Sequence, residues 1–478
     1  MRSPPTTAEI LERWALATPH HVAVVEEGRA LTHGQFCAMV THAARMLRQM
    51  GVQPGDCVAV GGPAFTLELV LLLAAEGIGA CTISFRDQDD PDLDFVLRHS
   101  RWVLSGRAGP AASHAGFRLA DEAFLAALGQ PLATVGGPWV PLPAETAHRI
   151  SRTSGSGGRS KFMHVPRPVQ DYWVHGSVDV NGYDARTRLH IAGPLIINLA
   201  YARASACLRA GGTVMAGSGQ WLPRYLPTHL WGMPLLLERL LDAMPADWRS
   251  PHPVQVAAVG GVLTPTLRQR LRDRLGAEPV GRYGSNEVGG VCDGLDDTGL
   301  GIVRPGVDVR ILDAQGADLP PGTWGRIALR SSAMVTGYID RPQETAEAFQ
   351  DGWFLTPDLG MLVQPRLLRV AGRMDDLVNL GGAKVAASEF ENTLRATGTV
   401  ADCAVVSVHA PGSDMSVGVA AVLAPGASPE AVLEKLTGLF NLQGQVVAQL
   451  VVLKELPRLP TGKVDRVGLL GLFRRAAG

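Results

Sequence analysis

Helical and strand patterns alternate along this chain from its N-terminus to about residue 260, and this alternation constrains the fold more than any other feature. Amphipathic patterns predict helices over residues 7–19 and 32–50. The segment CVAVGG, which follows a Gly- and Pro-containing turn, predicts a short buried strand. Such alternation is typical of α/β layers with mostly parallel sheets.

The most apolar stretch of the chain runs from Phe65 to Ile83 and is interrupted by Glu68 and Glu76. We interpret it as a buried helix leading into a strand, because the two carboxylates argue against a membrane span. Residues 127–150 are rich in Pro, Gly and Ala and predict a loop.

The pattern changes to short strands and turns from about 300 to 370, in VDVRILD, GRIALR, GWFLTPDLG and LLRVAGR. After Asp375 a helix over 386–396 is followed by the strand CAVVSVHAP and another strand–helix pair. The chain has 478 residues, too many for one ordinary core, so we place a domain boundary near 374–376.

The predicted fold class is therefore α/β. A large N-terminal domain of layered sheets and helices spans residues 1–374 and contains a small β subdomain at about 300–374. A small α+β C-terminal domain spans residues 375–478.

Composition excludes several function classes. The net charge of −1 gives no electrostatic field that would attract a nucleic acid polymer or an anionic membrane. The six cysteines show no CxxC spacing, which predicts reduced buried thiols in a cytoplasmic protein and no metal framework. The first residues lack the apolar core of a signal peptide, and we expect no membrane span.

Residues 151–164 read SRTSGSGGRSKFMH, a loop dense in hydroxyls and glycines that ends in Lys161. Glycines free the backbone N–H groups to form a concave anion site, hydroxyls add donors, and a lysine supplies positive charge. The alternative is a flexible Gly/Ser linker. The Walker spacing of a phosphate-binding loop is absent. The proposed phosphate-binding residues are Thr153, Ser154, Gly155, Ser156, Gly158 and Lys161.

Two later motifs have the chemistry to complete a nucleotide site. In GRYGSNEVGG, Tyr283 lies among glycines that leave its ring open to a flat base, and Glu287 offers the oxygen ligands of a hard cation. In DGWFLTPDLG, we place Asp358 after a strand and a turn, where its carboxylate can accept bonds from both ribose hydroxyls. The alternatives are a turn with a surface Glu287 and an ordinary turn-forming Asp358.

Two further motifs lie near the C-terminal domain. In AGRMDDLVNLGGAKVAASEFE, Arg373 precedes an acidic pair, and a surface salt bridge with Asp375 is the alternative to a functional role. In LPRLPTGKVDR, Lys463 follows Thr-Gly, and the alternative is an ordinary solvated lysine.

Taken in this order, the five motifs resemble those of the adenylate-forming superfamily, which includes acyl- and aryl-CoA synthetases, peptide-synthetase adenylation domains and firefly luciferase. The resemblance covers nearly the whole chain, from LTHGQF near residue 31 to GKVDR near 466. It implies an AMP-forming acid–thiol ligase that uses ATP and Mg²⁺.

The resemblance also implies roles for individual residues. Tyr283 would stack on adenine, Glu287 would bind Mg²⁺, and Asp358 with Arg373 would hold the ribose. Lys463 would be the catalytic lysine, and Glu287 and Arg373 would also be catalytic residues. Asp375 would be the hinge of a mobile C-terminal domain. The nucleotide-binding set implied by the resemblance further includes Gly284, Ser285 and Asn286.

Three positions depart from the family pattern, namely Gly157, Asn286 and Pro357. None of them removes a charged group. The loss of a hydroxyl at Asn286 changes the donor geometry available to the α-phosphate.

The expected substrate wall is HIAGPLIINLAYARASACLRAGG. By resemblance, amino-acid-activating relatives place an Asp where this chain has Asn198, and an amide cannot neutralise an ammonium group. The wall is otherwise apolar with Tyr201, and NLGGAKVAASEFE resembles aryl-acid ligases, in which an Asn faces the ortho hydroxyl of the ring. These features favour an aryl or small apolar carboxylic acid; a helix-capping or core-bonded amide is the alternative for Asn198. The implied pocket residues are Asn198, Tyr201, Gly260, Gly261, Gly284 and Ser285.

The sequence leaves the acceptor open between coenzyme A and the phosphopantetheine of a separate acyl or peptidyl carrier protein. Activation of amino or fatty acids, or transfer to an amine or alcohol, remains an alternative on the same fold. Weaker alternatives are an oxygenase of the luciferase kind and a nucleotide-binding pseudoenzyme, against which the retention of five charged residues argues.

Overall fold

The computed structural model describes most of the chain. The described residues are 4–62, 64–130, 136–140, 146–153, 160–260, 263, 265–296, 298–374, 377–380, 383–410, 413–441, 447–458 and 464–476. The chain divides into two compact units. The first consists of residues 1–293, 304–308 and 330–354, and the second of residues 294–303, 309–329 and 355–478.

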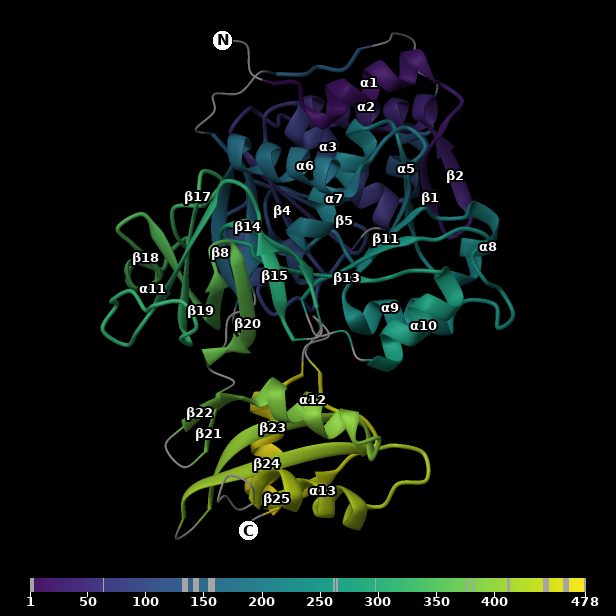
Figure 1. Ribbon diagram of the computed structural model, residues 1–478. Helices are drawn as coiled ribbons and strands as arrows, with labels where there is room; N and C mark the ends of the chain where they lie inside the picture. Colours follow the sequence, from purple (N-terminus) through teal and green to yellow (C-terminus); the bar gives the residue numbers. More distant parts are fainter. Residues whose placement is uncertain are drawn as a thin grey trace. The chain divides into compact units, whose positions relative to one another are not determined.

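The first unit contains alternating helices and strands (Figure 1). Its elements are α1 Thr7–Ala17, β1 Val22–Glu26, β2 Arg29–Thr32, α2 His33–Gln49, β3 Cys57–Gly61, α3 Phe65–Gly77, β4 Cys81–Phe85, α4 Leu93–Arg98, β5 Trp102–Ser105, β6 Phe117–Leu119, α5 Glu122–Leu128, β7 Ala147–Thr153, β8 Lys161–Pro166, α6 Arg167–Asn181, β9 Arg188–Ala192, α7 Asn198–Arg209, β10 Thr213–Ala216, α8 Leu222–Tyr225, β11 His229–Gly232, α9 Pro234–Asp242, β12 Gln255–Ala258, α10 Pro265–Leu275, β13 Val280–Ser285, β14 Gly289–Leu295, α11 Pro342–Ala348 and β18 Phe349–Gln350, with the last two residues of β14 in the second unit.

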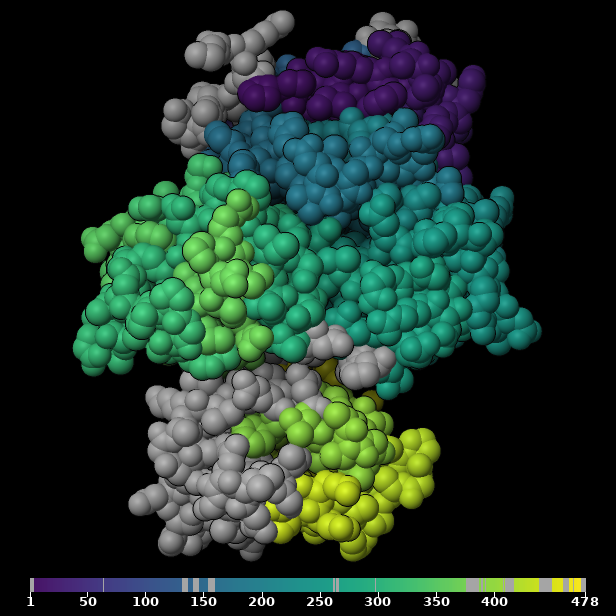
Figure 2. Space-filling view, viewed as in Figure 1, coloured from purple at the N-terminus to yellow at the C-terminus, as the bar shows by residue number. Residues whose placement is uncertain are grey.

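The two predicted N-terminal helices are confirmed as α1 and α2, and their starts have a clear local cause. Thr6 accepts a hydrogen bond from the backbone of Glu9 while the Glu9 carboxylate binds the Thr6 backbone N–H, and Thr32 and Gln35 repeat this arrangement. Such capping boxes satisfy N–H groups that have no partner inside a helix. In Figure 2 these helices, in purple, cover the blue and teal surface of the same unit.

Two sheets organise the first unit, and their pairing confirms the predicted parallel α/β layers. One has the strand order β6-β5-β3-β4-β7-β8, with only the β7–β8 pair antiparallel among its described pairs. The other includes the run β13-β12-β11-β9-β10-β1-β2, parallel from β13 to β1. The predicted helix–strand interpretation of the apolar stretch is confirmed as α3 and β4. Helix α3 contacts strands of both sheets, so it lies buried between them.

The second unit contains strands and a set of helices toward the C-terminus. Its elements are β15 Leu300–Val303, β16 Val307–Leu312, β17 Gly325–Ser331, β19 Trp353–Gln364, β20 Leu367–Arg373, β21 Leu377–Leu380, β22 Ala383–Ala386, α12 Ala387–Ala396, β23 Val400–Ala410, β24 Ser413–Leu423, α13 Pro429–Asn441, β25 Val447–Val452 and α14 Arg466–Ala476, with the first residues of β16 and β19 and the last of β17 in the first unit.

The predicted strands of the β subdomain are confirmed as β16, β17, β19 and β20, and the predicted helix near 386–396 as α12. The hairpin β21–β22 and the helix α14 were not predicted. The predicted loop over 127–150 ends earlier than expected, because β7 already begins at Ala147 and pairs with β4. The predicted boundary at Asp375 falls on a residue outside the described set.

All six cysteines are free thiols. Among the described residues, no helix combines the length and apolarity that crossing a bilayer requires.

Candidate functional site

The hairpin β7–β8 holds the two ends of the glycine-rich motif. Thr153 is the last residue of β7 and Lys161 the first of β8, and the two are direct partners in the antiparallel register. The predicted phosphate-binding residues Ser154, Gly155, Ser156 and Gly158 lie outside the described residues, as does Gly157. The first and last residues of the motif, Thr153 and Lys161, are therefore held next to each other by the hairpin.

Arg152 lies in the same stretch, one residue before Thr153, and is anchored by an acidic pair. Its guanidinium donates to Asp90 at 2.7 and 2.9 Å and to Asp92 at 3.1 Å. Burial alone raises the pKa of the Asp90 carboxyl, but the hydrogen bonds and charge of Arg152 outweigh burial and hold that pKa below its usual value. The Asn286 amide donates to the Arg152 carbonyl at 2.9 Å, which ties the GRYGSNE motif to the strand that leads into the glycine motif.

Glu287 lies directly after Asn286 and is only 5% exposed. The Tyr338 hydroxyl donates to its Oε1 at 2.9 Å, and the backbone N–H of Val335 donates to its carbonyl at 2.9 Å. This burial excludes a solvated carboxylate on a surface turn, which was the alternative to a functional role.

Lys161 also contacts Tyr338, over its ring. Its Nζ is 4.8 Å from the ring centroid and 2.9 Å from the Glu344 carboxylate on α11. Hydrogen bonding to Lys161 lowers the pKa of Glu344. Tyr338 thus contacts both Lys161, at the end of the glycine motif, and Glu287, and an anion bound to Lys161 would compete with Glu344.

Tyr283, Gly284 and Ser285 form the end of β13, ahead of the buried Glu287. A Cβ at Gly284 would lie 2.4 Å from the Gly289 carbonyl, so only glycine fits at this close approach. The Ser285 hydroxyl accepts the Val288 backbone N–H at 3.3 Å.

Asp358 and Arg373 belong to the second unit, where they are direct partners in the antiparallel pair β19–β20. The prediction that Asp358 follows a strand and a turn is wrong, because Asp358 lies within β19. The buried Thr356 hydroxyl accepts the Asp358 backbone N–H at 3.1 Å and donates to the Ile327 carbonyl at 2.8 Å. The Thr-Pro-Asp segment forms these two hydrogen bonds as part of strand β19.

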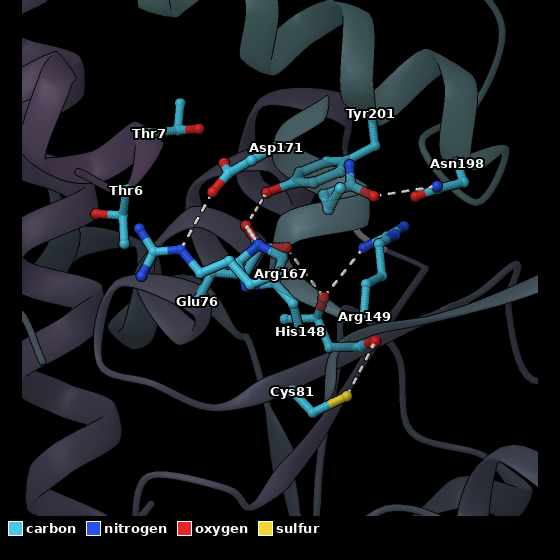
Figure 3. A network of polar contacts seen from close by, with 12 residues as sticks. Thr6, Thr7, Glu76, Cys81, His148, Arg149, Arg167, Asp171, Asn198 and Tyr201 are labelled. Carbon is cyan, nitrogen blue, oxygen red and sulfur yellow. Dashed lines mark hydrogen bonds and ion pairs between the residues drawn. The ribbon is translucent and has the colours of Figure 1, made fainter. Parts of the chain in front are cut away.

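The predicted substrate wall begins with Asn198, the first residue of α7, which is 2% exposed. Tyr201, one turn later, donates its hydroxyl to Glu76, which also pairs with His148 at 3.0 Å (Figure 3). Burial raises the pKa of Tyr201 well above its usual value. Any contact of Tyr201 with a substrate would therefore come from its ring.

Gly260, in the left-handed region at φ +76°, follows β12. Three further predicted site residues lie outside the described set, in addition to those of the glycine motif: Gly261, Asp375 and Lys463. Their roles stay predictions.

The sequence alone did not identify Arg152, Gln170, Tyr338 or Glu344. Gln170 on α6 accepts a hydrogen bond from Asn198, Arg152 is bound by Asn286 through its carbonyl, Tyr338 binds Glu287, and Glu344 pairs with Lys161. The only local signal for Tyr338 and Glu344 is an aromatic residue beside Gly337, just before a helix that starts at Pro342.

The donor set around Glu287 suits one kind of metal binding. In the described part of the chain, no three His, Cys, Asp or Glu side chains gather as a metal site. Mg²⁺ is commonly held by one or two carboxylates together with substrate phosphates and water. A single buried carboxylate next to a predicted phosphate loop fits that mode.

Comparisons with known proteins identify the family and the fold. A family profile described as AMP-binding enzyme matches residues 11–339. A feruloyl-CoA synthase of an Amycolatopsis species is 29% identical over 429 residues, covering 84% of this chain and 85% of the relative. A salicylyl-CoA synthase / salicylate adenylyltransferase of a Streptomyces species is 27% identical over 531 residues, covering 98% of this chain and 93% of the relative. The crystal structure of ATP-bound MatB from Rhodopseudomonas palustris shares the fold, with a TM-score of 0.87 over the whole of both chains at 24% identity.

Proposed function

Because the chain belongs to the AMP-binding enzyme family, we propose that it activates an aryl carboxylic acid with ATP and passes the acyl group to a thiol. Both named relatives are CoA synthases by name, and one is also named a salicylate adenylyltransferase. The aryl substrate and the thiol acceptor are the proposed parts.

One observation carries the proposal. Tyr338 contacts the cation of Lys161 through its ring and the buried carboxylate of Glu287 through its hydroxyl, and Lys161 is paired with Thr153 across the ends of the glycine motif. A polyphosphate needs positive charge from the protein and a carboxylate for its cation. The first unit supplies both groups: the Lys161 ammonium lies 4.8 Å from the centroid of the Tyr338 ring, and the Glu287 carboxylate lies 2.9 Å from the Tyr338 hydroxyl.

The proposed first step is attack by a substrate carboxylate oxygen on the α-phosphorus of ATP. A bond forms between that oxygen and phosphorus, the bond to the pyrophosphate oxygen breaks, and acyl-AMP remains. Such transfers depend on positioning and charge neutralisation rather than on covalent protein chemistry. We assign Lys161 and the glycine motif to the phosphates, Tyr283 to adenine, and Asp358 with Arg373 to the ribose.

Glu287 would hold Mg²⁺, which when bound would offset negative charge on the ATP phosphates. In the second step the thiol loses its proton and its sulfur attacks the acyl carbon. A C–S bond forms, the acyl C–O bond of the mixed anhydride breaks, and AMP leaves with the electrons of that bond. We propose coenzyme A or the phosphopantetheine of a separate carrier protein as the thiol.

An aryl acid is supported by two relatives, named for feruloyl and salicylyl substrates, and by the apolar residues of the expected wall. Asn198 has no charge to neutralise the ammonium group of an amino acid. An apolar pocket with a few polar groups is typical of a site for such acids.

We further propose that Lys463 acts in the first step and leaves the site when the C-terminal domain rotates about Asp375. The substitution Lys463→Ala should then block adenylation far more than thiol transfer from supplied acyl-AMP. Equal loss in both half-reactions, measured separately, would refute the rotation.

The test of the function is carboxylate-dependent release of pyrophosphate with ATP and Mg²⁺. The panel holds benzoates, salicylate, dihydroxybenzoate, cinnamates, fatty acids and amino acids, each with and without coenzyme A. Turnover with an aryl acid supports the full proposal, and turnover with fatty or amino acids alone overturns the aryl assignment. No pyrophosphate with any acid would contradict the adenylation reaction.

A further inference from the structure

Two of the free cysteines are neighbours in the six-stranded sheet of the first unit. Cys57 is the first residue of β3 and Cys81 the first of β4, and the two are direct partners in the parallel register of these strands. Adjacent strands lie about 4.8 Å apart, which is within the Cα separation of roughly 4.4–6.8 Å at which disulfides occur. The backbone therefore places the two residues at a distance that a disulfide bridge can span.

The two side chains also lie on the same face of the sheet. Cys81 belongs to a buried apolar cluster with Ile83 and Phe85, and Cys57 packs against that cluster. Val58, the next residue of β3, belongs instead to the core on the opposite face, as the alternation of a strand requires. The two thiols are hydrogen-bonded to each other.

The two thiols differ in acidity. The hydrogen bond from Cys81 lowers the pKa of Cys57, and the Ser100 hydroxyl, 4.0 Å from the Cys57 Sγ, acts in the same direction. The same hydrogen bond and burial raise the pKa of Cys81 well above its usual value. Because the thiolate is the reactive form of cysteine, Cys57 is the thiol that reacts first.

Cys57 is also the accessible member of the pair. It is partly exposed, whereas Cys81 is 4% exposed. The carboxylate of Asp56, which precedes Cys57, opposes a thiolate there. Its charge is partly offset, because Arg101 Nη1 and Trp102 Nε1 each donate to it at 3.1 Å. A small reagent can therefore reach a thiol that is already activated by its neighbour.

We propose that Cys57 and Cys81 form a reversible oxidation site, at which a small disulfide converts the two thiols into an intramolecular disulfide bridge. The Cys57 thiolate attacks one sulfur of the small disulfide, whose S–S bond breaks, and the thiolate that leaves takes up the proton lost by Cys57. The Cys81 sulfur then attacks the Cys57 sulfur of this mixed disulfide, and the second thiolate leaves and takes up the Cys81 proton. The protein loses two electrons, and the small disulfide is reduced to two thiols.

This site is separate from the candidate nucleotide site. Strands β3, β4 and β7 are parallel, so Cys57 and Cys81 lie at the edge of the sheet where these strands begin. Thr153, at the start of the glycine motif, is the last residue of β7 and lies at the opposite edge. The bridge would join the starts of β3 and β4 and enclose α3 in a covalent loop. The oxidation site therefore does not depend on the proposed function.

The test is oxidation of the folded, full-length chain with 2-hydroxyethyl disulfide, followed by intact-mass measurement and peptide mapping. For the wild-type protein we expect the loss of two hydrogen atoms, a link between the peptides that contain Cys57 and Cys81, and full reversal by dithiothreitol. A short peptide with one cysteine, oxidised in parallel, shows that the reagent is active.

Single variants separate the two chemical steps. Cys81→Ser lacks the second attacking sulfur, so the reaction should stop at the mixed disulfide on Cys57, and the mass should rise by one mercaptoethanol group. If that variant is unstable, Cys81→Ala gives the same readout. Cys57→Ser should leave Cys81 unmodified. The matched control is Cys37→Ser in α2: burial raises the pKa of this thiol to about 11, and the variant should form the same bridge as the wild type.

Three outcomes would overturn the proposal. The first is that the wild-type protein keeps all six thiols while the cysteine peptide is oxidised. The second is a mixed disulfide on Cys57 that persists in the wild-type protein, because Cys81 would then be out of reach. The third is a bridge that involves any other cysteine.

Discussion

Removing the hydrogen bond from Tyr338 to Glu287 is the most direct test of the candidate site. The substitution Tyr338→Phe removes the hydroxyl that donates to Glu287 Oε1 at 2.9 Å but keeps the ring that lies 4.8 Å from the Lys161 ammonium. The change therefore separates the bond to the carboxylate from the cation–π contact.

The size of the effect follows from burial and charge. A hydrogen bond to a charged group contributes about 1.5–3 kcal/mol, and Glu287, at 5% exposure, has little water to replace a lost donor. Partners that orient a metal-binding carboxylate typically change metal affinity or activity by about 10- to 100-fold when removed. We therefore expect the pyrophosphate-release rate, or the Mg²⁺ concentration that half-saturates it, to change by at least about 10-fold.

The control is Tyr225→Phe, which deletes a hydroxyl that donates to the neutral Gly28 carbonyl at 2.8 Å in the same unit. This bond is worth about 0.5–1.5 kcal/mol, so the control should lower stability slightly and leave the Mg²⁺ dependence unchanged. If Tyr338→Phe resembles the control in both quantities, Glu287 does not serve the nucleotide as we propose.

Three further predictions concern the same unit. Glu344→Gln should release Lys161 and lower the KM for ATP several-fold. Stability should change little, because the Lys161–Glu344 ion pair is about one-third exposed. An unchanged or higher KM would contradict competition between Glu344 and the ATP phosphates for Lys161. Burial raises the pKa of Glu68 to about 7 from an ordinary value of 4.5, so the folded state holds a proton that the unfolded state has released. The Glu68 contribution to stability should then fall from about pH 4.5 to about pH 7. The stability gain of Glu68→Gln over the wild type, measured by thermal unfolding, should therefore grow over that window and level off above it. A gain that is constant with pH would contradict a protonated Glu68 in the fold. Tyr201→Phe should cost about 1.5–3 kcal/mol in urea unfolding because it removes a donor from the buried Glu76 carboxylate, and a loss under about 0.5 kcal/mol would contradict that contribution.

Much of the fold could be predicted because local patterns determine it. The capping residues Thr6 and Thr32 and the amphipathic stretches that follow them set α1 and α2, and the apolar run from Phe65 sets α3 and β4. Asp358 was misplaced because Pro and Asp are strong turn formers, whereas here the Thr356 hydroxyl supplies the local hydrogen bond inside a strand.

The polar network around Glu76 could not be predicted, because its partners are far apart in the sequence. Glu76 binds Tyr201, which is 125 residues away, and His148 on β7. The local sequence around each of these residues predicts a helix, strand or loop, but not which distant side chain it contacts. The buried position of Glu287 likewise depends on Tyr338, 51 residues further on. Short-range spacing identifies the motifs, but their burial and charge pairing arise only when the sheets assemble.

Direct detection of the acyl-adenylate tests the central claim most clearly. The protein is incubated with ATP, Mg²⁺ and salicylate without any thiol, and the bound and released products are identified by mass spectrometry. We expect salicyl-AMP and pyrophosphate, with both lost in Lys463→Ala. Formation of ADP and phosphate in place of AMP and pyrophosphate, or ATP that binds and is recovered intact with every acid, would contradict acid adenylation by this chain.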